Sequence, residues 1–227
     1  MSNLAMRRVL NCANIRALTH TTLLLSWVGC GTFAVQHTAE PVPRGTWRGA
    51  LVGSLQTLYD DEQRAKVPGG TLAIGVGRGM GRNSELGVTL YTLGVEAYGK
   101  VRLWHGPAGA ARWSLGLLAA VGGARLPANA LISPGTELHS RVVGLATVRT
   151  SSCVSWSFGP SIAGYEFLPR GGGREHGLWV GGFGNLAWQL SPRWAMVPEL
   201  SVHKAASGTF PVDDQVVQLS VGWSRTW

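Results

Sequence analysis

The chain has 227 residues, of which only 14% are charged, while Gly reaches 32 residues and Trp reaches 10. The formal net charge is +8, and it falls to 17 − 12 = +5 once the three arginines before residue 30 are removed. The basic residues are scattered singly, which excludes the Lys and Arg stripe that nucleic-acid binding needs. We therefore expect no nucleic-acid partner.

The first 29 residues have the layout of a secretory signal peptide. Arg7, Arg8 and Arg16 come before or at the edge of a mostly apolar stretch at residues 17–29. That stretch is too short to cross a bilayer core of about 30 Å as a helix. The alternative is an amphipathic first helix, but no helical periodicity continues past Gly31. The sequence therefore predicts export, with a signal peptide over residues 1–29.

The end of this segment carries a more specific pattern. Val28-Gly29-Cys30 resembles a bacterial lipobox, in which a Cys follows two small residues. The resemblance implies that Cys30 becomes the lipidated first residue of a lipoprotein, and Gly31 after it implies sorting to the outer membrane. An ordinary signal-peptidase cut, for example after Ala34, is the alternative.

The cysteines and the next fifteen residues follow from that reading. Cys12 would be discarded and Cys30 acylated, so Cys153 would stand alone and no intramolecular disulfide is expected. Residues 31–45 contain two prolines and no periodicity. We predict that residues 30–45 form a flexible tether.

From Thr46 to the C-terminus the chain alternates apolar with polar or small residues, which is the period of a β-strand. In residues 154–163, for example, large apolar side chains interleave with Ser, Gly and Ala. We predict a barrel domain over residues 46–227 with ten strands, although eight to twelve fit the pattern. The predicted strands are 46–58, 70–78, 84–92, 95–105, 111–122, 140–150, 152–165, 177–190, 193–203 and 215–227.

Two all-β architectures accept this pattern. A soluble sandwich or barrel has its apolar face inside, whereas a transmembrane barrel has its apolar face toward lipid. The predicted strands are about ten residues long, as a tilted strand crossing a bilayer requires, and soluble strands average about 5–6 residues. The polar face is rich in Gly, Ser, Ala and Thr, which suits a narrow lumen. We therefore predict a transmembrane antiparallel up-and-down β-barrel.

The tryptophans test this topology. With the first strand running outward from the periplasm, eight of them fall at the periplasmic rim, where indole rings favour the headgroup level. Trp104 is the imperfect member, because its phase matches that of lumen-facing residues. The predicted aromatic girdle consists of Trp47, Trp113, Trp156, Trp188, Trp194, Trp223 and Trp227.

In this pattern the sequence resembles small monomeric bacterial outer-membrane β-barrel proteins over residues 46–227. Family members end in an aromatic residue that the barrel-assembly machinery reads, and Trp227 fits that place. The resemblance implies location in the bacterial outer membrane, contact with its lipid and lipopolysaccharide, and a monomer.

Candidate catalytic motifs are weak. Residues 182–187 match a dinucleotide fingerprint, but they lie inside an alternating run with no helix after it. Glu137, His139 and Ser140 suggest a lipid hydrolase, yet adjacent strand residues point to opposite faces, so His139 and Ser140 would not meet. No metal-ligand spacing is present. We expect no catalytic residue, no metal and no cofactor.

The lumen-facing charges are more informative. Isolated charges in a narrow interior cost several kcal/mol, so they are expected to pair and close the lumen. The function predicted from this is a non-enzymatic lipoprotein barrel with a structural or surface-interaction role in the envelope. The alternatives are a lipid A deacylase or phospholipase-like hydrolase, and a narrow anion-preferring pore. The predicted network comprises Arg48, Glu85, Glu96, Lys100, Arg102, Arg112, Arg141, Arg149 and Glu199.

Overall fold

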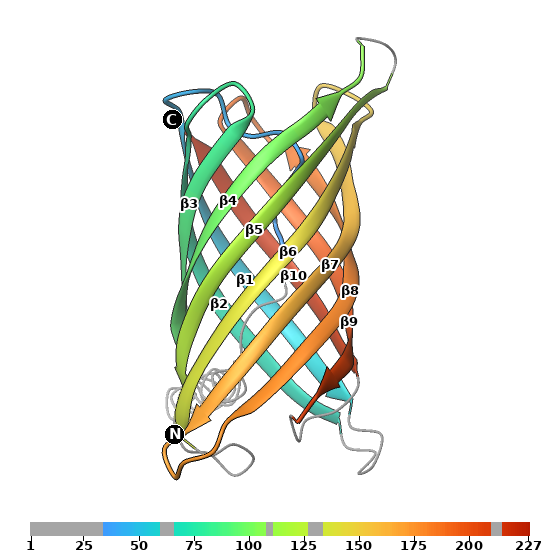
Figure 1. Cartoon of the computed structure of the whole chain (residues 1–227). Coiled ribbons are helices and arrows are strands. Elements are labelled where there is room, and N and C mark those ends of the chain that lie inside the picture. Colours follow the sequence, from blue (N-terminus) through green and yellow to red (C-terminus); the bar gives the residue numbers. More distant parts are fainter. Residues whose placement is uncertain (1–33, 60–65, 108–110, 127–133, 210–214) are drawn as a thin grey trace, which may run out of the picture.

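The computed structural model describes residues 34–59, 66–107, 111–126, 134–209 and 215–227. Ten strands pair antiparallel with their chain neighbours, and β1 pairs with β10 to close the barrel (Figure 1). The predicted ten-stranded up-and-down barrel is confirmed. The strands are β1 (Trp47–Tyr59), β2 (Lys66–Gly79), β3 (Ser84–Tyr91), β4 (Gly94–His105), β5 (Arg112–Leu126), β6 (Gly135–Arg149), β7 (Val154–Pro169), β8 (Glu175–Gln189), β9 (Trp194–Gly208) and β10 (Gln215–Thr226).

The two faces of the wall have opposite character. On β5, Leu115 and Val121 point outward and are 44% and 62% exposed, whereas Ser114 and Leu118 point inward and are buried. The same alternation holds around the barrel, so leucine, isoleucine and valine cover the outside. Buried Ser, Thr, Gln, Glu and His line much of the inside. A soluble barrel has the reverse arrangement, and a transmembrane barrel has this one. Within the described residues there is no helix of the length and hydropathy that crossing a membrane takes.

The seven girdle tryptophans are all between 39% and 56% exposed and lie near strand ends at one rim of the barrel. In Figure 1 this is the end where the C-terminus is marked. Trp104 also lies there, next to the end of β4, and the ladder between β4 and β5 shifts register between Arg102 and Trp104. The bulge turns both Leu103 and Trp104 outward, so the alternation predicted for Trp104 does not hold past Arg102.

Five strands extend four or five residues beyond their predicted ends, and all five do so at the rim opposite the tryptophans. They are β2, β5, β6, β7 and β9. Their added residues include charges, prolines and glycines, which were interpreted as loop residues. On β6 the added Glu137 faces polar groups inside the barrel, whereas the added Arg125, Glu166 and Lys204 have outward parity near the rim. Either place tolerates a charge, so the ladder continues through these residues.

Residues 34–44, here called the luminal segment, lie inside the barrel, which corrects the prediction of a flexible tether for this part of 30–45. Val35 is 2% exposed and Ala39 is fully buried. The segment reaches the tryptophan rim at Arg44, which bridges to Gly79, and Gly45 with φ of 78° turns the chain into β1. Prolines and missing periodicity indicated a tether, but side chains of the wall satisfy the backbone of this segment instead of a neighbouring strand.

Candidate functional site in the barrel lumen

The first charged centre of the lumen is built around Glu85 on β3. Its carboxylate accepts from Arg48 Nη2 at 2.6 Å, Lys100 Nζ at 2.9 Å and Tyr98 Oη at 2.9 Å. It also accepts from the backbone amide of Val42 at 3.1 Å, which ties the luminal segment to the wall. Register makes this possible, since Glu85 and Lys100 are direct partners in the β3–β4 ladder. Two buried cations therefore share one carboxylate that also anchors the segment.

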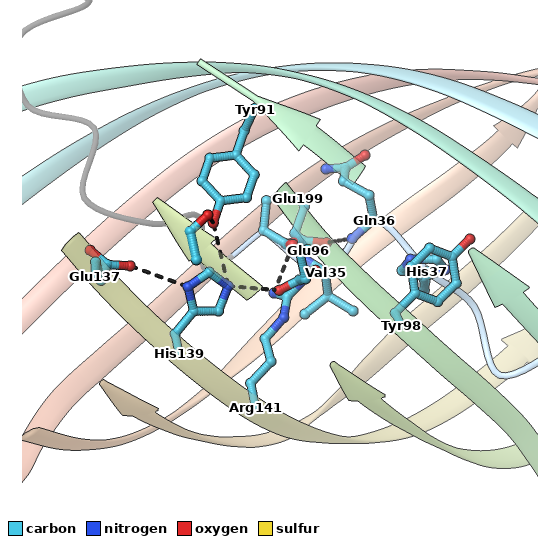
Figure 2. Close-up of polar contacts among 12 residues, drawn as sticks. Val35, Gln36, His37, Tyr91, Glu96, Tyr98, Glu137, His139, Arg141 and Glu199 are labelled. Carbon is cyan, nitrogen blue, oxygen red and sulfur yellow. Dashed lines mark hydrogen bonds and ion pairs between the residues drawn. The ribbon is translucent and has the colours of Figure 1, made fainter. Parts of the chain in front are cut away.

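The second centre lies on β4 and β6 and is drawn in Figure 2. Glu96 accepts from Arg141 Nη2 at 2.7 Å, and its other oxygen lies 3.4 Å from His139 Nε2. His139 Nδ1 lies 3.2 Å from Glu137. Glu137, His139 and Arg141 alternate along β6, so all three point into the lumen. The result is a continuous chain of paired charges.

Glu199 on β9 forms a third centre of a different kind. Its two oxygens accept from successive backbone nitrogens, Val35 N at 2.6 Å and Gln36 N at 2.7 Å. Asn185 Nδ2 donates to it at 3.2 Å and also to the His37 carbonyl at 3.2 Å. This carboxylate therefore holds the inner end of the luminal segment.

Other wall residues complete the clamp. Thr147 Oγ1 accepts from Ala39 N at 2.7 Å, and Lys100 Nζ donates to the Glu40 carbonyl at 3.0 Å. Gly79 makes room for the exit of the segment, because a Cβ there would collide with the carbonyl oxygens of Val42 and Pro43. The segment acts as a plug, because residues of the wall contact it from many sides. These contacts come from β1, β3, β4, β6, β8, β9 and β10.

His37 packs in the centre of this plug. Arg48 Nη2 donates to its Nδ1 at 2.6 Å, and its ring lies edge-on to that of Tyr98 with centroids 4.6 Å apart. Burial first, and then the charge of Arg48, lowers the pKa of His37 well below its usual 6.5; Lys100 and Arg141 add to the effect. His37 is therefore neutral and accepts a hydrogen bond.

Acidification is expected to loosen the plug through His37. In a released segment His37 regains a pKa near 6.5, so below that pH the released state binds the proton and is favoured. Between pH 7.5 and pH 5.5 the plugged state loses at most about 1.4 kcal/mol, which corresponds to at most a roughly tenfold rise in the released population. Opening events counted in planar bilayers at the two pH values measure this change. A His37→Gln chain with the same pH response as the unaltered chain would contradict it.

Six of the nine residues predicted for the lumen network face the lumen: Arg48, Glu85, Glu96, Lys100, Arg141 and Glu199. The other three lie near the rim, which corrects the assignment of Arg102 and Arg112, whereas Arg149 pairs there with Glu40 of the luminal segment. Arg102 donates to Asn83 Oδ1 at 2.7 Å, and Arg149 to Glu40 Oε2 at 2.9 Å. Arg112 is exposed and stands opposite Arg149 in the ladder. Near strand ends the interior opens to water, so parity alone does not bury a side chain.

Several residues of the charge network were not predicted to belong to it, although Glu137 and His139 had been considered as part of a hydrolase. Glu137 and His139 share the inward parity of Arg141, so extending the alternation of β6 toward Gly135 would have found them. Tyr98 shares the parity of Glu96 and Lys100 in the same way. His37 and the backbone of its segment had no comparable signal. Cys30 and the signal peptide over residues 1–29 lie outside the described residues.

The catalytic candidates stay apart. His139 is buried in the lumen and Ser140 is exposed on the outer face, as strand parity predicted. Ser161 Oγ and His203 Nε2 are hydrogen-bonded to each other and both are buried inside the barrel. The described ranges contain no group of three or more His, Cys, Asp or Glu residues arranged to hold a metal ion.

The residues on the outer surface indicate what surrounds the barrel. Around Ile74, which is 60% exposed, Leu51 and Leu90 stand on the neighbouring strands and are 50% and 58% exposed. Such a belt, closed around the barrel and bordered by tryptophans, needs hydrocarbon on its outside. The chain is a transmembrane β-barrel of the outer-membrane type.

Comparisons with known proteins find only distant likenesses. No protein-family model matches the barrel, and no curated protein does. Ail, the attachment invasion locus protein of Yersinia pestis, is 10% identical, with a TM-score of 0.37 over 82% of this chain and 100% of that chain. Neisserial surface protein A is 10% identical, with a TM-score of 0.37 over 80% and 99%. The outer membrane protease OmpT from Escherichia coli is 9% identical, with a TM-score of 0.37 over 85% and 100%.

Proposed function

We propose that this chain is a non-enzymatic barrel of the bacterial outer membrane, with a structural or surface-interaction role in the envelope. Its lumen is closed by the luminal segment and by the paired charges that hold it. Its surroundings are membrane lipid and lipopolysaccharide, and it acts as a monomer. The barrel-assembly machinery recognises its last strand, β10, and the Trp227 that follows it. The observation that carries the proposal is the filling of the lumen by the chain itself.

The space beside the luminal segment leaves little room for a solute. The internal cavity beside the luminal segment holds about 40 Å³ and is lined by Val35, His37, Arg48, Tyr98 and Arg141, among others. That is space for a water molecule or two. Ten strands enclose little more than their own side chains, and the luminal segment occupies space between Val35 and the tryptophan rim.

The charges favour closure over an anion path. A pore that prefers anions needs cations free to meet them. Here Arg48 and Lys100 are bound to Glu85, and Arg141 is bound to Glu96. The exposed arginines lie at the rim, where they do not form a continuous row through the barrel. A lipid hydrolase, in turn, needs a nucleophile and base that a lipid can reach, and the Ser161–His203 pair is buried inside the wall.

Conductance in planar lipid bilayers tests the proposal. The intact barrel is expected to insert without sustained conductance at neutral pH, showing only rare openings, and a chain lacking residues 35–43 is expected to conduct steadily. Ala39→Arg is a second opening variant, because Ala39 is fully buried and a long charged side chain there displaces the segment. Heat-modifiable gel migration verifies that both variants fold. Steady conduction by the intact barrel that reverses selectivity in Arg141→Glu would favour the pore, and lipid hydrolysis by the intact barrel would favour the enzyme.

A further inference from the structure

Glu199 differs from the other buried glutamates of the lumen. Glu85 and Glu96 each bind a Lys or Arg side chain, and Glu137 binds His139. Glu199 takes part in none of the salt bridges formed by the described residues, although it is only 2% exposed. Its closest donor is the backbone nitrogen of Val35, at 2.6 Å. Arg141 attracts this carboxylate electrostatically but is paired with Glu96, so a positive charge at the Val35 nitrogen would be strongly favoured.

The sequence around Val35 has the features of a signal-peptidase site. Residues 17–29 form the apolar region, and five residues later the chain reaches Ala34. Thr32 and Ala34 supply small side chains at the third and first positions before the Ala34–Val35 bond. The bond that would create a charged nitrogen opposite Glu199 is thus also a bond that export would cut.

We propose that signal peptidase cleaves between Ala34 and Val35, and that the new α-ammonium group of Val35 forms a buried ion pair with Glu199. Hydrolysis adds one water: the Ala34 carbonyl carbon leaves as a carboxylate on the signal peptide, and the Val35 nitrogen takes up protons. An α-amino group has an ordinary pKa of about 7.7–8.0, and a carboxylate at hydrogen-bond distance favours the charged form. The proposal goes beyond the closed lumen and adds a processing site that locks the plug.

The surroundings fix Val35 in position for this pair. Its side chain is buried in an apolar cluster with Tyr98, Leu118 and Phe183. Cleavage removes the Ala34 carbonyl, which accepts from Arg141 Nη1 at 3.0 Å, while Arg141 keeps its ion pair with Glu96 at 2.7 Å. Cleavage therefore costs Arg141 its hydrogen bond to the neutral Ala34 carbonyl. In exchange, the hydrogen bond between Val35 and Glu199 becomes charge-assisted.

Mass spectrometry of the protein purified from outer membranes tests the cut directly. The expected N-terminal peptide begins at Val35 with an unmodified amine. A peptide that begins at acylated Cys30, or at any other residue, would overturn the proposal. The closed lumen is tested separately by conductance, so the two failures are distinguishable.

Amine labelling and stability test the ion pair. An amine-reactive acetylating reagent is expected to label Val35 only after the barrel is unfolded by heat, whereas exposed Lys204 is labelled in both states. Glu199→Gln is expected to lower the melting temperature of the chain that begins at Val35 more than that of a refolded chain that retains Ala34. Labelling of Val35 in the folded barrel, or equal losses in the two chains, would rule out the pair.

Discussion

Replacing Glu85 with Gln is expected to lower the free energy of unfolding by about 3–5 kcal/mol. Gln keeps the shape of the side chain but leaves Arg48 and Lys100 in the lumen without their shared counter-charge. It also weakens the hydrogen bond to Val42 N, so the luminal segment loses an anchor. Urea unfolding in lipid vesicles, followed by tryptophan fluorescence, measures the change.

Glu166→Gln is the matched control for this substitution. Glu166 pairs with Arg174 at 2.7 Å, as close as the pair at Glu85, but the Arg174 side chain is 69% exposed. Solvent screens an ion pair at the surface, so its loss is expected to cost less than about 1 kcal/mol. Equal losses for the two variants would show that the lumen centre is not a buried charge network.

Replacing Ile74 with Arg is expected to lower the stability of the barrel in lipid by about 2–4 kcal/mol. Ile74 is 60% exposed and lies four residues along β2 from Arg78, which pairs with Trp47 at the rim. That distance is roughly 13 Å of strand, which puts the side chain deep in the hydrocarbon. A charged group there must leave water or deform the bilayer. Equilibrium refolding into vesicles measures the loss.

Leu103→Arg is the depth control. Leu103 is 67% exposed, about as much as Ile74, but it precedes rim residue Trp104. Arg at the interface can extend its head group into water, so the expected cost is about 0–1 kcal/mol. If both variants refold with unchanged stability, the outer face of the barrel does not lie in lipid.

The fold followed from the sequence because a wall between lipid and a narrow lumen imposes one periodicity on every strand. Ser114, Leu115 and Leu118 point as their parity predicts, and a one-residue slip would turn them to the wrong face. The failures have local causes. The bulge after Arg102 breaks the alternation at Trp104, and charges near Gly135 were interpreted as a loop although they face polar groups inside.

The site was predictable only in part. Parity identified Glu85, Glu96 and Glu199 as inward-facing, because successive side chains of a strand alternate between its two faces. The partner of Glu199 was not predictable, since the backbone of Val35 lies 164 residues away and has no side-chain signature. A segment that binds a barrel interior through its backbone needs no particular side chains. Its composition is therefore the same as that of a flexible tether.

Amide hydrogen exchange over residues 36–44 of the folded barrel in lipid nanodiscs tests most directly whether the chain plugs its own lumen. The amides of Gln36, Ala39 and Val42 donate to buried side chains of the wall. Their exchange is expected to be at least about 100-fold slower than that of the exposed connection at residues 171–173, because each must open before it exchanges. Exchange of residues 36–44 as fast as that of 171–173 would mean that the segment is a tether and the lumen is not closed by it.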